Sequence, residues 1–142
     1  MVVAVVPVLG REPLVYHTIS RLIDLVDEVV CVVENHVDRQ ICANLGAFIC
    51  NSYGNPLGKK WNDGFWEARQ FNPDFVLYMG SSDWVSDNWI EEMTKYDAEI
   101  IGTLDYHLLH LEYHPDKYKD TIYKFKGSYD LEKMKRGFLG SW

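Results

Sequence analysis

The chain has 142 residues, a formal net charge of −7 and 47% hydrophobic residues, which is the balance of one folded domain with its own core. The negative charge argues against binding to nucleic acid or to an anionic membrane, because both need a positive field. No apolar run approaches the roughly 20 residues that cross a bilayer, so no transmembrane segment is expected. Three cysteines without a C-x-x-C spacing predict reduced thiols and, with them, a cytoplasmic protein.

Apolar runs and helical periods alternate along the first part of the chain. Residues 2–9 form a continuous β-branched run, which is typical of a strand buried on both faces. Pro13 suits the start of a helix, and apolar residues then recur at helical spacing. The predicted elements are a strand at 2–9, a helix at 14–26, a strand at 27–35, a short helix at 37–46, a strand at 47–53, a helix at 57–71 and a buried strand at 73–83.

This order predicts an α/β fold with a mainly parallel, twisted sheet flanked by helices, as in Rossmann-like proteins. A helix is expected at 86–96. Residues 98–113 and 121–127 resemble two strands around a polar loop, which predicts a late antiparallel hairpin. Residues 1–142 are therefore interpreted as a single domain, with a core over about 1–96 and the hairpin region over 97–142.

Polar or turn-forming residues lie at the carboxyl end of each predicted strand, at 7–11, 34–38, 51–54 and 80–83. Ligands of parallel α/β sheets bind outside the carboxyl ends of the strands, so these four tips are expected to converge on one crevice. The last tip, "GSSD", carries two hydroxyls and the carboxylate of Asp83. Such a tip can hold a hard divalent cation through oxygen ligands, or it can simply form a turn that caps the next helix.

The segment "GNPLGKKW" at 54–61 carries glycines and lysines at an expected helix start. It is one residue short of a phosphate loop, and Lys60 replaces the Ser or Thr that holds magnesium, which disfavours a nucleoside triphosphatase. Gly58, Lys59 and Lys60 can still cradle a diphosphate, although a solvated helix start is an equally good reading. A G-x-G-x-x-G fingerprint is missing after the first strand, which disfavours a nicotinamide dehydrogenase.

Taken in order, the segments "VVPVLGRE", "VVENHVD", "NSYGNPLGKKWNDGFWEA" and "FVLYMGSSDWVSDNWIEEM" resemble the family 2 glycosyltransferases, which have the A-type nucleotide-sugar fold. The resemblance covers roughly residues 2–95. It implies transfer of a sugar from a nucleotide-diphosphate sugar to an acceptor hydroxyl. The matching positions are Asn55, Leu57, Asn62 and Gly64 in the third segment and Asp83 and Trp84 in the fourth.

The resemblance also implies a set of binding residues. It places the nucleotide base near the first two strand tips, the diphosphate over the start of the helix at 57–71, and a Mg or Mn ion at Asp83. Departures from the family are Gly80 and Ser82 in place of its metal-binding Asp residues, and Trp61 in place of a phosphate-binding Arg. The candidate site residues are Pro7, Val8, Arg11, Glu34, Asn35, Asn51, Gly58, Lys59, Lys60, Ser81, Ser82 and Asp83.

Two other functions stay open. A non-catalytic nucleotide-sugar or partner-binding module is favoured by Gly80 and Ser82, and by the short stretch after Asp83, where the family has its acceptor-binding half and catalytic base. No residue is assigned as that base. Nucleotidyl transfer onto a sugar phosphate shares the fold class, but "GRE" is a poor substitute for its glycine-rich loop. Aromatic residues near Phe138 and Trp142 predict possible self-association.

Overall fold

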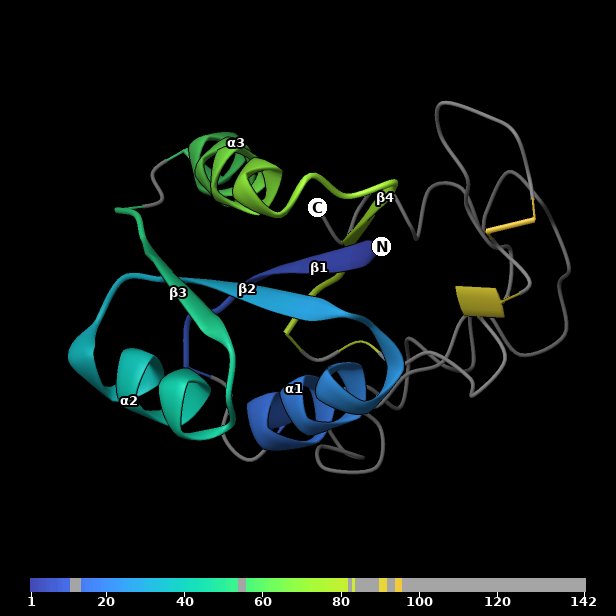
Figure 1. Cartoon of the computed structure of the whole chain (residues 1–142). Coiled ribbons are helices and arrows are strands. Elements are labelled where there is room, and N and C mark those ends of the chain that lie inside the picture. Colours follow the sequence, from blue (N-terminus) through green and yellow to red (C-terminus); the bar gives the residue numbers. More distant parts are fainter. Residues whose placement is uncertain (11–13, 54–55, 82, 84–89, 92–93, 96–142) are drawn as a thin grey trace, which may run out of the picture.

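The computed structural model describes residues 1–10, 14–53, 56–81, 83, 90–91 and 94–95 (Figure 1). In that part, a four-stranded parallel sheet has the strand order β3-β2-β1-β4. This confirms the α/β class and the parallel sheet with flanking helices. The elements are β1 (Val2–Pro7), α1 (Leu14–Leu25), β2 (Glu28–Val33), α2 (His36–Asn44), β3 (Phe48–Asn51), α3 (Leu57–Ala68), the 3-10 turn η1 (Arg69–Phe71) and β4 (Phe75–Tyr78).

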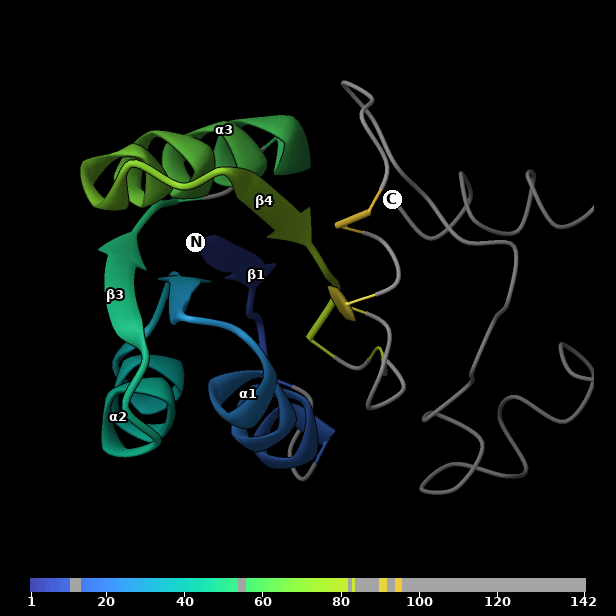
Figure 2. The same ribbon diagram turned by 45° about the vertical axis from the view of Figure 1, so that its right-hand side comes forward.

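The helices lie on both faces of the sheet. Helices α1 and α2 cover one face and α3 covers the other, as both views show (Figures 1 and 2). The chain builds β1, β2 and β3 in one direction, and α3 then carries it back to β4 on the other side of β1. The strand order therefore reverses between β1 and β4, which is the kind of position where parallel α/β sheets bind ligands.

Strands β1 and β2 form the core, and both are buried on their two faces. Alternate residues of a strand point to opposite faces, so Ala4 and Val6 pack in the cluster that includes α1 and α2. Val3 and Val5 pack in the second cluster, together with Ala68 of α3. The continuous β-branched run at the start of the chain was therefore interpreted correctly, because each face of the strand meets a helix layer.

Helix α3 lies unusually close to the sheet at Gly64. A Cβ atom at this position would lie 2.5 Å from Val32 Cγ2 and 2.5 Å from Val5 Cγ1. Gly64 and Ala68 are four residues apart and therefore lie on the same side of the helix. Small side chains on this stripe let the helix backbone contact the two central strands directly.

The prediction for β4 needs a correction. The strand was expected to be buried and to reach residue 83, but it ends at Tyr78, whose side chain is 38% exposed. Among the described residues, β4 pairs with β1 alone and forms an edge of the sheet. The N–H of Met79 still donates to the carbonyl of Val5 at 3.1 Å, and the chain then leaves the sheet in a turn at Gly80.

Several predictions lie outside the described residues and stay predictions. These are the positions of Arg11 and Ser82, most of the helix at 86–96, the late hairpin and the region 97–142. Within the described ranges, no helix is long and apolar enough to cross a membrane. The cysteines, all of which are described, are buried and carry free thiols.

Candidate functional site

The strand tips at the carboxyl edge are held next to one another by backbone hydrogen bonds that continue past the strands. The N–H of Val8 donates to the carbonyl of Val32 at 2.9 Å, and the N–H of Ser52 donates to that of Val33 at 3.0 Å. Together with the Met79 bond, these contacts tie the tip of β1 to β2, that of β3 to β2, and that of β4 to β1. The four strand tips therefore lie side by side along one edge of the sheet.

Lys60 joins α3 to the tips of β1 and β2. Its Nζ donates to the carbonyl oxygen of Val8 at 2.7 Å and lies 3.6 Å from Oε1 of Glu34. The side chain of Lys60 is 3% exposed and that of Glu34 is 24% exposed. Burial lowers the pKa of Lys60, and the neighbouring Glu34 opposes this effect. Three predicted site residues, Val8, Glu34 and Lys60, are thus in direct contact.

Asn35 and Asp38 fix the start of α2. Asn35 is the N-cap residue: its Oδ1 accepts from the N–H of Asp38 at 2.8 Å, and its Nδ2 donates to Asp38 Oδ2 at 2.8 Å. The same Oδ2 atom accepts from the N–H of Gly10 at 2.9 Å. Gly10 has a φ of +66°, in the left-handed region that favours glycine. Asp38, which is buried, therefore links the loop after β1 to the N-terminus of α2.

Lys59 and Asn51, two other predicted site residues, each have a side-chain partner. Lys59 Nζ is ion-paired with Asp63, one turn along α3, and the Ser52 hydroxyl donates to the same Asp63 Oδ2 at 2.5 Å. The hydrogen bond from Lys59, and then that from Ser52, lowers the pKa of Asp63. Asn51 Oδ1 accepts from Arg39 Nη2 at 2.7 Å. Lys59 is 54% exposed and can reach a ligand by leaving Asp63.

The tip after β4 is a tight turn closed by Asp83. The N–H of Gly80 donates to Asp83 Oδ2 at 2.8 Å, and the N–H of Asp83 donates to the carbonyl of Gly80 at 3.2 Å. The hydroxyl of Thr18 on α1 donates to the carbonyl of Asp83 at 3.1 Å. A Cβ at position 80 would lie 2.7 Å from Asp83 Oδ2. Only glycine fits at position 80 without a shift of its surroundings, because the Asp83 carboxylate occupies the space of a side chain. Ser81 is buried in the same turn.

The donor set for a metal ion is thin in the described part of the chain. No group of three or more His, Cys, Asp or Glu side chains is placed there to share one ion. Asp83 brings a single carboxylate, and one of its oxygens already accepts from Gly80. A hard cation such as Mg or Mn prefers about six oxygen ligands in octahedral geometry. The residues described do not fit such a site.

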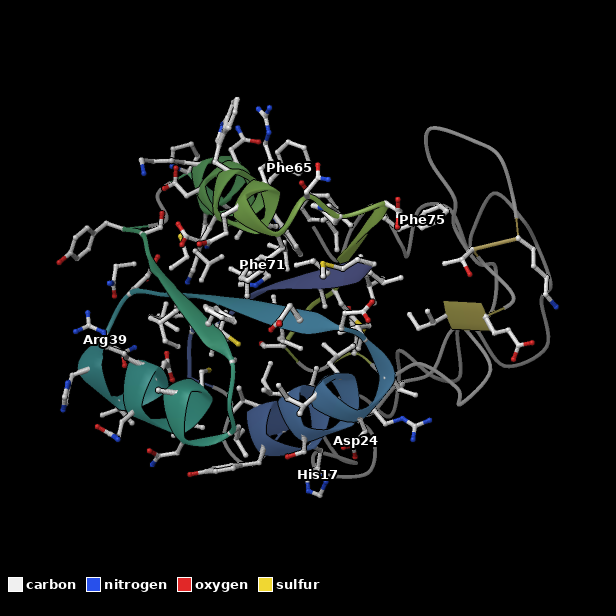
Figure 3. All side chains as sticks on the ribbon, in the orientation of Figure 1. His17, Asp24, Arg39, Phe65, Phe71 and Phe75 are labelled. Atoms are coloured by element: carbon white, nitrogen blue, oxygen red, sulfur yellow. The ribbon has the colours of Figure 1, made fainter. Side chains whose placement is uncertain are left out.

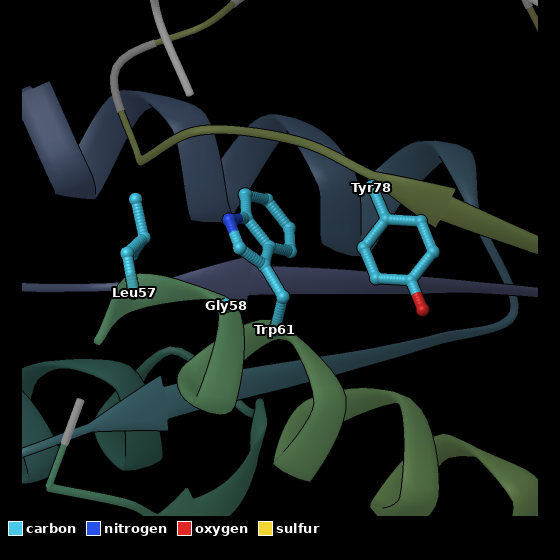
Figure 4. A pocket seen from close by; sticks show the side chains of 4 residues that line it. All are labelled: Leu57, Gly58, Trp61 and Tyr78. Atoms are coloured by element: carbon cyan, nitrogen blue, oxygen red, sulfur yellow. The ribbon is translucent and has the colours of Figure 1, made fainter. Parts of the chain in front are cut away.

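An apolar hollow of about 420 Å³ lies between the first turns of α3 and the end of β4 (Figure 4). Leu57, Gly58, Trp61 and Tyr78 line it. The rings of Trp61 and Tyr78 meet edge to face, with centroids 5.2 Å apart, and Phe65 stacks on Tyr78 with centroids 6.3 Å apart. Trp61 therefore contributes an aromatic wall to the hollow.

Gly58 lies open at this hollow. Among the described residues, apart from its chain neighbours and the backbone of its own helix, no heavy atom lies within 4 Å of the position of a Cβ there. A ligand can therefore approach the backbone at the start of α3 closely. His17 and Asp24, by contrast, point from α1 away from the sheet (Figure 3). Arg39 of α2 reaches the tip of β3, where it donates to Asn51.

The structure also identifies site-supporting residues that were not predicted. Asp38 could have been found, because an Asn followed three residues later by an acid resembles a capping box. Thr18 had no such signal, since its contact with Asp83 joins distant parts of the chain. Pro7 and Ser81 have the expected places at the tips of β1 and β4.

Comparison of the chain with protein-family models, with curated proteins and with solved structures found no match. Function is therefore inferred from the residues at the carboxyl edge of the sheet.

Proposed function

We propose that the chain binds a nucleotide-diphosphate sugar at the carboxyl edge of its sheet and acts as a glycosyltransferase toward an acceptor hydroxyl. The observation that supports this most is the reversal of strand order between β1 and β4, with polar tips on both strands and on β2. This is where parallel α/β sheets bind nucleotides. The ordered sequence motifs that resemble family 2 glycosyltransferases point to the same edge.

The proposed ligand extends across the tips in a defined order. The base lies against Pro7, Val8, Arg11, Glu34 and Asn35, and Asn51 borders the base or the ribose. The diphosphate lies over Gly58, Lys59 and the tip formed by Ser81, Ser82 and Asp83, with the buried Lys60 beneath the strand tips. The sugar ring extends toward the apolar hollow beside Trp61 and Tyr78. Concave sites with aromatic walls and a few polar groups are the usual form of small-molecule sites.

The chemistry is a substitution at the anomeric carbon of the donor sugar. The acceptor oxygen forms the new C–O bond, and the bond to the diphosphate breaks with its electron pair leaving on the phosphate oxygen. A base removes the acceptor proton. The protein lowers the barrier mainly by stabilising the negative charge on the leaving diphosphate. Lys59 and the N-terminus of α3, whose N-cap residue Pro56 makes no side-chain hydrogen bond, can supply this stabilisation. The resemblance to family 2 glycosyltransferases places the catalytic base, which removes this proton, in the region after Asp83.

A non-catalytic nucleotide-sugar or partner-binding module is the second candidate. It is favoured by the turn at Gly80, where a carboxylate has no room because Asp83 Oδ2 already occupies the space. With one carboxylate at this tip, binding can persist without transfer. Release of a nucleoside diphosphate from an added nucleotide sugar separates the two candidates, because only the enzyme produces it.

Self-association of the chain is also proposed, and light scattering of the purified chain measures it.

Calorimetric titration with uridine and guanosine diphosphates, with and without manganese, tests the proposal. We expect binding of at least one of them, and we expect Gly58→Ala to weaken it by about tenfold, because a methyl group blocks close approach of the phosphates. The melting temperature of Gly58→Ala should not fall, since the part of the chain that the structure describes offers no clash with the added atom. Asp83→Ala should remove any part of the affinity that depends on manganese.

Asp24→Ala is the matched control for Asp83→Ala, because Asp24 lies on the outer surface of α1 (Figure 3). It removes one carboxylate and should leave the titration curve unchanged. Failure of both nucleotides to bind the unmodified chain would reject the proposed donor site. Binding that depends on neither manganese nor Asp83 would assign the diphosphate to Lys59 and the start of α3.

A further inference from the structure

The two neighbouring lysines of α3 are in opposite situations. Lys59 is 54% exposed and pairs with Asp63 on the surface of its own helix. Lys60 is 3% exposed, and its ammonium lies beneath the strand tips between the carbonyl of Val8 and the carboxylate of Glu34. A group that binds a diphosphate directly must be able to reach it. Lys59 meets this condition because its side chain is exposed. Lys60 does not meet it, because its ammonium is buried and donates to the carbonyl of Val8.

The contacts of Lys60 connect the strand tips against which the nucleotide base is proposed to lie. Val8 receives the Lys60 hydrogen bond on its carbonyl and gives its own N–H to Val32 of β2. Glu34 follows β2 directly and stands at the tip of that strand. One ammonium group therefore holds α3, β1 and the Glu34 carboxylate in a fixed relation. Glu34 itself is 24% exposed, so part of its side chain reaches the surface above the buried lysine.

We propose that Lys60 is a positioning residue, which acts through Glu34 by fixing its carboxylate toward the nucleotide base and does not contact the diphosphate. This inference rests on the proposed function, and it differs from the diphosphate contact that the sequence predicts for Lys60. A fixed carboxylate accepts hydrogen bonds from bases with a ring N–H at the pairing edge, as in guanine and uracil. Adenine has an unprotonated ring nitrogen there, which repels the carboxylate.

The test is a comparison of dissociation constants for guanosine, uridine and adenosine diphosphates. These ligands share the ribose and the diphosphate, so the ratio of their affinities isolates the base. We expect a preference of about tenfold or more for guanosine or uridine diphosphate over adenosine diphosphate in the unmodified chain. Lys60→Met should reduce this ratio to near one. Lys59→Met should weaken all three nucleotides by the same factor and keep the ratio.

A double-mutant cycle distinguishes positioning from a general structural role. Glu34→Gln should lose the base preference, and Lys60→Met added to it should cause no further change in the ratio. Arg69→Met is the charge control, because Arg69 stacks on Trp66 at the far end of α3. Lys60→Gln is the second variant if Lys60→Met does not fold, because its amide can still donate to Val8. It should lose the preference as well.

Each result has a separate meaning. An unmodified chain that binds none of the three nucleotides overturns the proposed function and the positioning role together. Nucleotide binding with a base preference that Lys60→Met or Lys60→Gln retains overturns the positioning role alone. Equal weakening of all three nucleotides in these variants means that Lys60 contacts the diphosphate, which also overturns it. Loss of the ratio in both Lys60 variants and in Glu34→Gln supports it.

Discussion

Gly64→Ala is expected to lower the free energy of unfolding by about 2–3 kcal/mol, the upper part of the range typical of overpacking in a close-packed core. The added methyl group would lie 2.5 Å from side-chain atoms of both Val5 and Val32. These valines are fully buried and stiff at χ1, so they cannot turn away. Helix α3 must therefore move off the sheet. Urea denaturation, followed by circular dichroism, measures the change.

Gly58→Ala is the matched control in the same helix. A Cβ at this position meets no described residue beyond its own helix within 4 Å, so the variant should keep its stability or gain up to about 1 kcal/mol from the better helix propensity of alanine. The two variants make the same chemical change in α3. Equal unfolding midpoints for Gly64→Ala and Gly58→Ala would contradict the close contact of α3 with β1 and β2.

Asp38→Ala is expected to cost about 1–3 kcal/mol of stability, since the substitution removes a buried carboxylate that accepts two hydrogen bonds. Asp38 Oδ2 accepts from Gly10 and from Asn35, and its carboxylate lies in the first turn of α2, where negative charge is favourable. Thermal unfolding should show a clear fall in the melting temperature. The loop after β1 should also become more accessible to proteolysis.

Asp38→Asn and Asp24→Ala complete this experiment. Asp38→Asn keeps one oxygen acceptor and the shape of the side chain, so it should lose less stability than Asp38→Ala. Asp24→Ala removes an exposed carboxylate and should change stability by less than about 0.5 kcal/mol. A melting temperature of Asp38→Ala equal to that of Asp24→Ala would show that the link between Gly10 and α2 contributes nothing.

The elements of the sheet and its helices could be predicted from local patterns. β-Branched runs and helical apolar spacing are determined by which faces are buried, and they gave six elements from β1 to α3 within a few residues of their observed bounds. The burial of β4 could not be predicted in this way. Its apolar run is like that of β1, but its place at an edge of the described sheet follows from the strand order.

The site was predictable in position but not in its contacts. Polar residues after parallel strands must gather at one edge, and this follows from the fold class alone. The different roles of Lys59 and Lys60 require the orientation of α3. Consecutive helix residues point about 100° apart, and only the spacing of Lys60, Gly64 and Ala68 indicates which of the two faces the sheet. That spacing was present in the sequence as a stripe of every fourth residue.

The place of β1 between β2 and β4 has a consequence for synthesis of the chain. β1 is made first, and its pairing with β4 joins Val2 to Phe75. At roughly 5–20 residues per second, a nascent chain contains β1 for several seconds before β4 exists. During that time one side of an apolar strand has unpaired N–H and C=O groups, the feature that promotes pairing with other chains. Newly made or refolding protein should therefore aggregate more readily than the finished fold, and dilution or chaperones should improve its yield.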